Sequence, residues 1–343
     1  MSESETPNIK AKTSIMAPVK KLAVLTATSA CLPYAIGAVI APSPSALSNS
    51  QSSLTLLYQN NLNFTDDINH ISAILLDPST AANAATGCAA LNETLISQSA
   101  LQAHSQDFVN QLSYIIYAGR ATQDQKWHIA SGQTVEVHNN ALKFAKAGPG
   151  NVLPVLCTQS SQSNMPSNAV ASASNEIKVA SSGNTYVGFR NKKSWRFQGI
   201  PFANQPERFA YSTLYSKTGQ TIDATKYGPD CAQPYESSSS EDCLFLNIQT
   251  PYIPKAGSMK NLRPVHFWIY GGGFTGGSGA SAGSDGGQLA SREDIVVVEI
   301  NYRLTTLGFL AIPGTNITGN YGISDQVTGL DVSALHSIKV INC

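Results

Sequence analysis

Two apolar runs separated by a glycine-rich segment constrain the fold of this chain more than any other feature. The first run, residues 264–270, reads PVHFWIY, and the second, residues 295–302, reads IVVVEINY. Nearly continuous apolar runs of this length are typical of strands buried on both faces, as in a parallel sheet covered by helices. The sequence therefore predicts an α/β fold with a central parallel sheet.

Further strand-like runs place these two strands in a larger domain. We assign this domain to residues 175–330, because strand patterns recur after residue 175 and a divergent tail, residues 331–343, follows. Between the two apolar runs, only a short helical piece is expected, around residues 287–292. The additional strand-like runs lie at residues 184–189, 194–197 and 244–249.

The residues before this domain have a different character. Residues 42–174 are predicted to form an N-terminal extension that is mostly helical, because apolar residues between 66 and 117 recur near helical spacing. Alternating residues around 127–138 predict a few strands. Polar, low-complexity stretches at 42–52 and 158–174 read as a linker and as the domain boundary.

The glycine-rich segment 270–283, YGGGFTGGSGASAG, permits three chemistries. It contains G-x-S-x-G around Ser281, the pattern of a hydrolase nucleophile, and G-x-G-x-x-A ending at Ala282, a dinucleotide-binding pattern. Both patterns need a helix directly afterwards, and poor helix formers follow instead. The third candidate is the glycine triplet 271–273, whose N–H groups can hold the charge of a carbonyl oxygen. The loop residues alone leave such a site and a structural turn equally open.

Residues 180–330 resemble the type-B carboxylesterase family, the group that contains fungal lipases and cholinesterases. The resemblance implies an α/β-hydrolase fold, represented by its N-terminal strands, and a carboxylic ester hydrolase that uses a serine nucleophile. It rests on motifs in the family's order: FQGIPFA at 197–203, EDCLFLN at 241–247, WIYGGGF at 268–274, NYRL at 301–304 with GFL at 308–310, and GNYGISDQ at 319–326.

The resemblance also implies roles for single residues. Gly272 and Gly273 match the two oxyanion donors of the family's loop, with Tyr270 where histidine often stands. Arg208 and Glu241 match an ion pair that ties a neighbouring loop to the core. A small-molecule or lipid ester is the implied substrate of an intact relative, and no cofactor or metal is implied.

Disulfide pairing follows from the same resemblance. Cys243 matches a half-cystine whose partner lies upstream, and here that partner is Cys231. With that pair assigned, Cys88 and Cys157 remain in the expected mature chain and are expected to pair as well. The loop between Cys231 and Cys243 is short and polar, which favours an esterase without an interfacial lid.

The resemblance stops short of the catalytic triad. The sequence matches the family as far as Gly329 and Leu330, whereas the family's serine, acid and histidine follow later. We therefore expect this polypeptide to be inactive as given, to leave the strand at 264–270 as an unpaired edge, and to be poorly soluble. Two alternatives remain open: a non-catalytic binding member of the family, and a non-functional fragment.

The N-terminus indicates export. Lys20 and Lys21 precede a mostly apolar run, so residues 1–41 read as a signal peptide region, and Pro33 argues against a single membrane anchor. Asn63, Asn92 and Asn316 lie in N-x-S/T sequons.

The composition agrees with a globular, secreted chain. The six cysteines show no C-x-x-C spacing, and the formal net charge is zero, so nothing favours metal, nucleic acid or anionic lipid. We expect a secreted glycoprotein without a stable membrane span, and its oligomeric state is left open.

Overall fold

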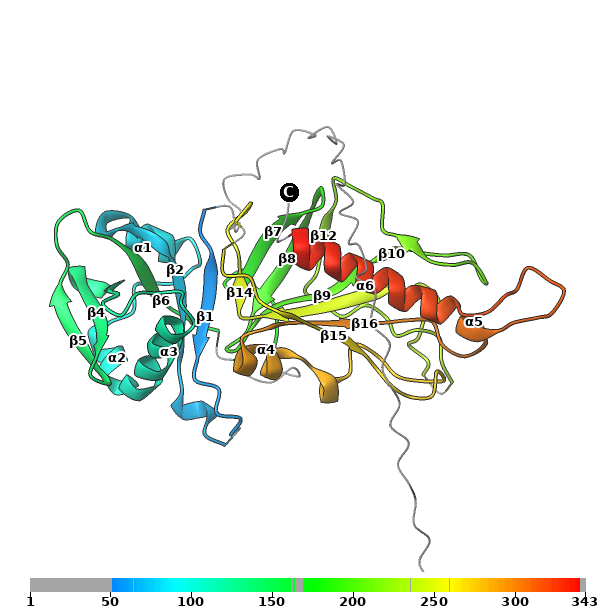
Figure 1. Cartoon of the computed structure of the whole chain (residues 1–343), viewed down its shortest axis with the longest axis horizontal. Coiled ribbons are helices and arrows are strands. Elements are labelled where there is room, and N and C mark those ends of the chain that lie inside the picture. The colour runs from blue at the N-terminus through cyan, green and yellow to red at the C-terminus, as the bar shows by residue number, and fades with distance from the viewer. Residues whose placement is uncertain are drawn as a thin grey trace, which may run out of the picture. The chain divides into compact units, whose positions relative to one another are not determined.

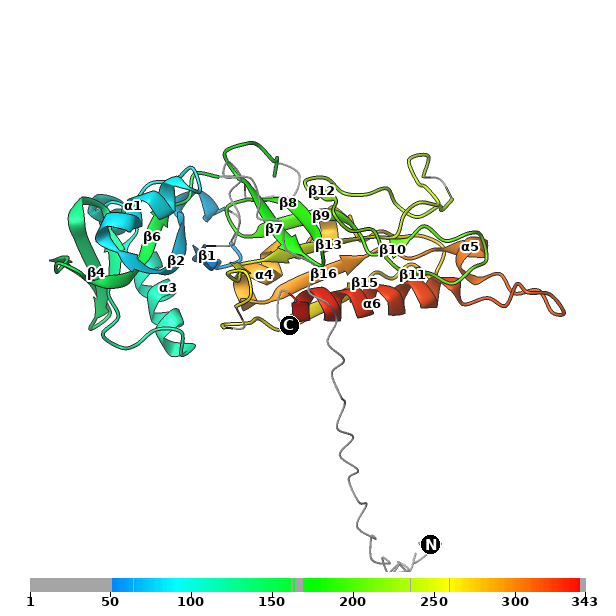
Figure 2. The same ribbon diagram turned by 90° about the horizontal axis from the view of Figure 1, so that it is seen from above.

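The computed structural model describes residues 51–339 apart from Phe64, Gln162, residues 164–168, Tyr235 and Met259 (Figures 1 and 2). Side chains are described as far as Val332. The expected signal region, residues 1–41, lies outside the described residues, as do Cys31 and Cys343.

The domain predicted after residue 175 contains a mixed sheet in the order β12-β8-β9-β13-β16-β15, with β7 paired to β8 (Figure 1). The two long apolar runs form β15 and β16, which pair in parallel as the sequence predicts. The neighbours β8, β9, β13 and β16 pair antiparallel, so the sheet is mixed rather than parallel throughout. Its strands are β7 (Glu176–Ser181), β8 (Asn184–Arg190), β9 (Trp195–Pro201), β12 (Thr221–Asp223), β13 (Phe245–Thr250), β15 (Val265–Ile269) and β16 (Val296–Ile300).

Within the described part of the chain, strand β15 is the unpaired edge that was expected, and it is not buried on both faces as its apolar run alone predicts. Val297, Val298 and Ile300 of β16 are buried, but Trp268 and Ile269 of β15 are 39% and 41% exposed. The reason is its position, because among the described residues β15 pairs with β16 alone and forms the sheet edge. An apolar edge of this kind is a template for association with another strand.

Short helices and strands surround this sheet. Helix α6 begins two residues after Gly319 and extends through the segment expected to be a divergent tail, as far as residue 339. These elements are α4 (Gly287–Glu293), α5 (Thr305–Phe309), α6 (Tyr321–Lys339), β10 (Ala203–Asn204), β11 (Thr213–Leu214), β14 (Tyr252–Ile253) and a 3-10 turn, η4 (Ala282–Ser284).

The N-terminal extension is not mostly helical, and this prediction was wrong. Its strands form a second sheet with β14 in the order β14-β1-β2-β6-β3-β4-β5, beside three helices. The apolar run from Ile71 to Leu76 fits both periods, and pairing with strands on either side makes it a strand. Helical spacing was informative only around Phe108, Leu112 and Ile115, which are buried in α3. The elements are β1 (Leu54–Tyr58), η1 (Asp67–Asn69), β2 (Ser72–Thr80), α1 (Ala81–Ala89), α2 (Gln98–Ala103), α3 (Ser105–Tyr117), β3 (Trp127–Ile129), η2 (Ala130–Gly132), β4 (Gln133–His138), β5 (Ala141–Lys146) and β6 (Val152–Thr158).

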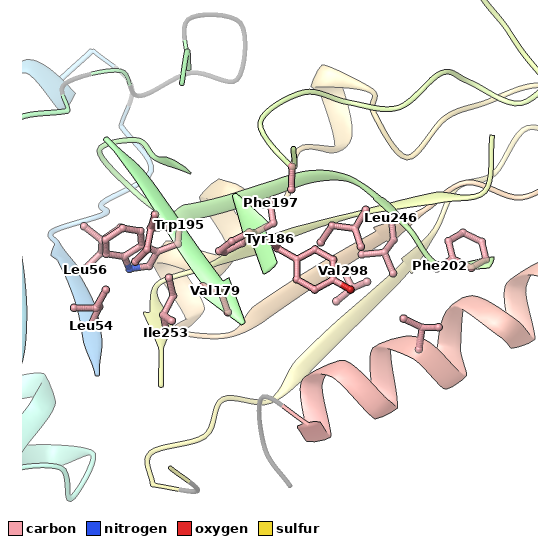
Figure 3. Close-up of a cluster of buried hydrophobic side chains, with 14 of the residues drawn as sticks. Leu54, Leu56, Val179, Tyr186, Trp195, Phe197, Phe202, Leu246, Ile253 and Val298 are labelled. Atoms are coloured by element: carbon pink, nitrogen blue, oxygen red, sulfur yellow. The ribbon is translucent and has the colours of Figure 1, made fainter. Parts of the chain in front are cut away.

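A shared hydrophobic core joins the extension to the second domain. Leu54 and Leu56 of β1 belong to the same buried cluster as Trp195, Phe197 and Val298 (Figure 3). Strand β1 also pairs with β14, which follows β13 of the other sheet along the chain, so main-chain hydrogen bonds join the extension to a segment of the second domain. Contacts therefore cross the predicted boundary at 158–174, and residues 41–343 form one compact unit.

Buried ion pairs cross the same junction. Glu93 accepts a hydrogen bond from Nη2 of Arg190 at 2.6 Å, and Asp67 pairs with Nζ of Lys193, also at 2.6 Å. All four side chains are at most 2% exposed. Removing one partner from such a pair leaves an uncompensated buried charge, so the junction depends on both sides.

Candidate active site

The glycine triplet forms an exposed turn directly after β15. Gly272 has φ 123° and Gly273 has φ 61°, both in the region that favours glycine. A Cβ atom on Gly272 would lie 2.1 Å from the carbonyl oxygen of Gly276, so no larger residue fits without moving the backbone. The turn therefore requires glycine at position 272 for both conformation and space.

Two N–H groups of this turn are free to bind a ligand. Among the described residues, no group accepts a hydrogen bond from the N–H of Gly272 or Gly273. The carbonyl of Gly272 is occupied, because it accepts hydrogen bonds from the N–H and Oγ1 of Thr275 at 3.2 and 3.0 Å. A Cβ atom on Gly273 would meet no atom within 4 Å. Adjacent free donors beside open space can hold a negatively charged oxygen.

Two tyrosines fix the start of the turn. Tyr270 and Tyr302 stack with ring centroids 4.5 Å apart, and each hydroxyl donates to the other residue's carbonyl oxygen, at 3.1 and 3.0 Å. Burial raises the pKa of Tyr270 well above its ordinary value, which keeps the hydroxyl protonated and able to donate. The ends of β15 and β16 are thus locked together where the turn begins.

The segment after β16 supports the turn from the other side. Arg303 makes a buried bidentate pair with Asp325 of α6, with both hydrogen bonds at 2.8 Å. The N–H of Thr305 donates to the carbonyl of Phe274 at 2.8 Å, and the ring of Phe274 lies 4.6 Å from that of Phe309. The NYRL and GFL motifs therefore connect the glycine turn to α6.

The two other patterns in the glycine segment have no supporting geometry. Ser281 lies in an exposed loop before the 3-10 turn η4, without the strand and helix that a nucleophile elbow needs. Only the three-residue 3-10 turn η4 begins at Ala282, and the next α-helix, α4, starts at Gly287. Among the described side chains, no histidine hydrogen-bonds to a serine.

Both expected disulfides are present. Cys231 is bonded to Cys243, and Cys88 of α1 is bonded to Cys157 of β6. All four cysteines are buried. The first bond closes the loop beside the glycine segment, and the second holds a helix of the extension against its sheet.

Arg208 and Glu241 also meet, but at the surface. The Nε of Arg208 donates to Glu241 at 2.8 Å, while the two side chains are 67% and 37% exposed. Exposed pairs add little stability because solvent screens them. This pair therefore links Arg208 to the end of the disulfide loop without adding much to the stability of the fold.

Two side chains that contact the glycine segment were not identified from the sequence. Gln233 bonds to both main-chain groups of Gly277, and Asn301 accepts the N–H of Gly279 at 2.9 Å. Only their positions in the sequence could have indicated these two residues, since Gln233 follows Cys231 by two residues and Asn301 is the first residue of the NYRL motif.

The three glycosylation sequons lie at the surface. The sequon residues Asn63, Asn92 and Asn316 are all exposed. Within the part of the chain that the structure describes, no helix is long and apolar enough to cross a membrane. The described residues also contain no group of histidine, cysteine and acidic side chains arranged to hold a metal.

The region that carries this turn is similar to a known family. Residues 179–332 match the family model described as the carboxylesterase family. The fold class of this region is accordingly that of the α/β-hydrolases, and its strands correspond to the N-terminal part of that fold.

The proteins similar to this region include a lipase and an esterase. Bile salt-activated lipase of Bos taurus is 36% identical over 176 residues, which is 46% of this chain and 29% of that protein. Para-nitrobenzyl esterase of Bacillus subtilis is 37% identical over 149 residues, 39% of this chain and 29% of the relative. The chain thus spans less than a third of these relatives.

A similar solved structure is the carboxylesterase of Geobacillus stearothermophilus. It is 37% identical, with a TM-score of 0.42, over 46% of this chain and 34% of that one.

Proposed function

We propose that residues 179–332 are the N-terminal part of a carboxylic ester hydrolase and that Gly272 and Gly273 supply its oxyanion donors. The observation that carries this proposal is the exposed turn after β15, where both N–H groups have no acceptor among the described residues. The family of the region supports ester chemistry.

The role of the turn follows from the chemistry of acyl transfer. In an intact enzyme of this kind, a serine attacks the ester carbonyl and a histidine transfers the proton. The carbonyl oxygen then becomes negatively charged, and donors placed in advance stabilise it more than they stabilise the substrate. Gly272 and Gly273 are the donors that this chain would contribute, without a metal or cofactor.

The polypeptide as given is proposed to lack turnover by this mechanism. Ser281 is exposed, and none of the described histidines bonds to a serine. Without a nucleophile and base, donors alone retain only a small part of the rate.

The proposal also includes the localisation of the protein. Two disulfides and three exposed sequons support a secreted glycoprotein. The short polar loop between Cys231 and Cys243 supports an esterase without an interfacial lid. The family of the matched region supports a small-molecule or lipid ester as the substrate of the intact enzyme.

Hydrolysis of p-nitrophenyl acetate and butyrate by the purified chain tests the inactivity. We expect no turnover above the uncatalysed rate, and no difference between the wild type and Ser281→Ala. Turnover that Ser281→Ala abolishes would show that the exposed serine is a nucleophile and would refute this assignment.

A further inference from the structure

Three hydrogen-bonded links join residues 229–233, at the start of the disulfide loop, to the glycine segment. Ser278 donates a hydrogen bond to Asp230, and Asn301, which binds Gly279, donates to the carbonyl of Pro229 at 3.0 Å. The third link is Gln233. Of these three links, only Gln233 lies within the loop closed by Cys231 and Cys243, because Pro229 and Asp230 precede Cys231.

Gln233 makes the most complete of these contacts. Its Oε1 accepts the N–H of Gly277 at 2.9 Å, and its Nε2 donates to the carbonyl of Gly277 at 3.0 Å. The same Nε2 donates to the carbonyl of Cys231 at 3.1 Å. One carboxamide therefore joins a half-cystine to both main-chain groups of one glycine.

Gly277 packs against the start of the turn formed by Gly271, Gly272 and Gly273, which we call the oxyanion turn. A Cβ atom at position 277 would lie 2.3 Å from the ring of Tyr270 and 2.8 Å from the carbonyl oxygen of Gly271. Similarly, the carbonyl of Gly276 packs against Gly272. A movement of residues 276–277 is therefore expected to reach the turn, because Gly276 packs against Gly272 and Gly277 packs against Tyr270 and Gly271.

We propose that Gln233 is a positioning residue for the oxyanion turn and that the Cys231–Cys243 loop acts on the turn through it. The inference rests on the proposed function only for the role of the turn in binding an oxyanion. The contacts between Gln233, Gly277 and the turn do not depend on that function. Gln233 holds Gly277, Gly277 and Gly276 back the turn, and the turn presents the N–H groups of Gly272 and Gly273.

Residue-resolved amide hydrogen exchange of the full chain tests this inference. In Gln233→Ala, the N–H of Gly277 loses its acceptor and should exchange about tenfold faster. The decisive reporter is the N–H of Thr275, which bonds across the turn to Gly272 and does not touch Gln233. We expect it to exchange about threefold to tenfold faster as well. A change confined to Gly277 would overturn the proposal.

A conservative variant separates positioning from general damage. In Gln233→Glu, the protonated carboxyl retains a donor and an acceptor, whereas the ionised carboxylate can only accept. Exchange at Thr275, relative to wild type at each pH, should be normal below the pKa of this carboxyl and raised above it. A ratio that does not depend on pH would contradict the role of Gln233.

Two further variants complete the design. Gln106→Ala removes an exposed glutamine that bonds only within α3, and it should leave Thr275 unchanged. The double variant Cys231→Ser, Cys243→Ser should raise exchange at Thr275, and adding Gln233→Ala should raise it no further. Additive effects would show that the loop does not act through Gln233. None of these readouts involves ester hydrolysis, so failure here would leave the proposed function intact.

Discussion

Replacing Arg190 with methionine is expected to lower the free energy of unfolding by about 3–5 kcal/mol, because it leaves Glu93 charged and buried without its cation. Both side chains are at most 2% exposed, and Nη2 of Arg190 also donates to the carbonyls of Leu91 and Ser174 at 3.1 Å. These bonds join the N-terminal extension to the carboxylesterase region. Urea unfolding followed by tryptophan fluorescence measures the change.

The exposed pair in the same chain provides the control. Arg208→Met breaks the pair with Glu241 at the surface and should leave stability unchanged within error. Replacing both Glu93 and Arg190 with methionine should recover part of the loss, because no unpaired charge remains. Equal and small effects of Arg190→Met and Arg208→Met would mean that the extension is not held by this buried pair.

Glu299→Gln is expected to make the protein more stable at alkaline pH and to change little at acidic pH. Burial raises the pKa of Glu299 to about 8, and the negative charge of Asp285 adds to the shift. Its carboxyl oxygens accept hydrogen bonds from Nε2 of Gln249 at 3.1 Å and from the N–H of Gly286 at 2.9 Å. These two hydrogen bonds lower the pKa and offset only part of the effect of burial, so the protonated form is expected to predominate at pH 7.

The sign of the pH dependence follows from the direction of this shift. The folded state keeps a proton that the unfolded state releases above a pKa of 4.5. Stability is therefore present below that pH and is lost as pH rises toward 8, by up to about 1.4 kcal/mol per pH unit. Glutamine cannot ionise, so Glu299→Gln should exceed the wild type by roughly 4 kcal/mol near pH 8.

The difference between the two unfolding curves isolates this group, since all other titrations cancel. Glu207→Gln, at an exposed position, is the matched control and should give a difference that does not vary with pH. If the Glu299→Gln difference were equally flat, Glu299 would be ionised in the folded protein and the account of its burial would fail.

The sequence predicted the part of the fold that local patterns encode. The runs of β15 and β16 pair in parallel as expected, and the family motifs located the glycine turn and the Cys231–Cys243 disulfide. The Cys88–Cys157 disulfide was predicted by elimination once that pair was assigned. Strand β15 is exposed because, among the described residues, it pairs only with β16 and forms the edge of the sheet. The apolar run alone wrongly predicted that both of its faces are buried.

The rest depended on contacts between residues far apart in the chain. Glu93 and Arg190 are 97 residues apart, and nothing in either local sequence identifies the partner. Ile71 to Leu76 fit helical spacing but form a strand, because pairing with β1 and β6 satisfies their main-chain groups. Gln233 likewise contacts Gly277 across 44 residues, in a loop that the motifs mark only by its cysteines.

A chimera tests the central claim, that Gly272 and Gly273 are the oxyanion donors of an ester hydrolase. Residues 179–330 would replace the matching segment of the Bacillus subtilis para-nitrobenzyl esterase, which is 37% identical over 149 residues. In this chimera, Gly273→Ala places a methyl group in the open space before the donors and disfavours the φ of 61°. Gly271→Ala is the matched control, because its Cβ also meets no atom within 4 Å and its φ is not positive.

The measurement is kcat for p-nitrophenyl ester hydrolysis by the three chimeras. The account predicts an active parent, a loss of about a hundredfold or more in kcat for Gly273→Ala, and near-parental activity for Gly271→Ala. An active parent whose kcat is equally insensitive to both substitutions would contradict the assignment of the turn as the oxyanion site.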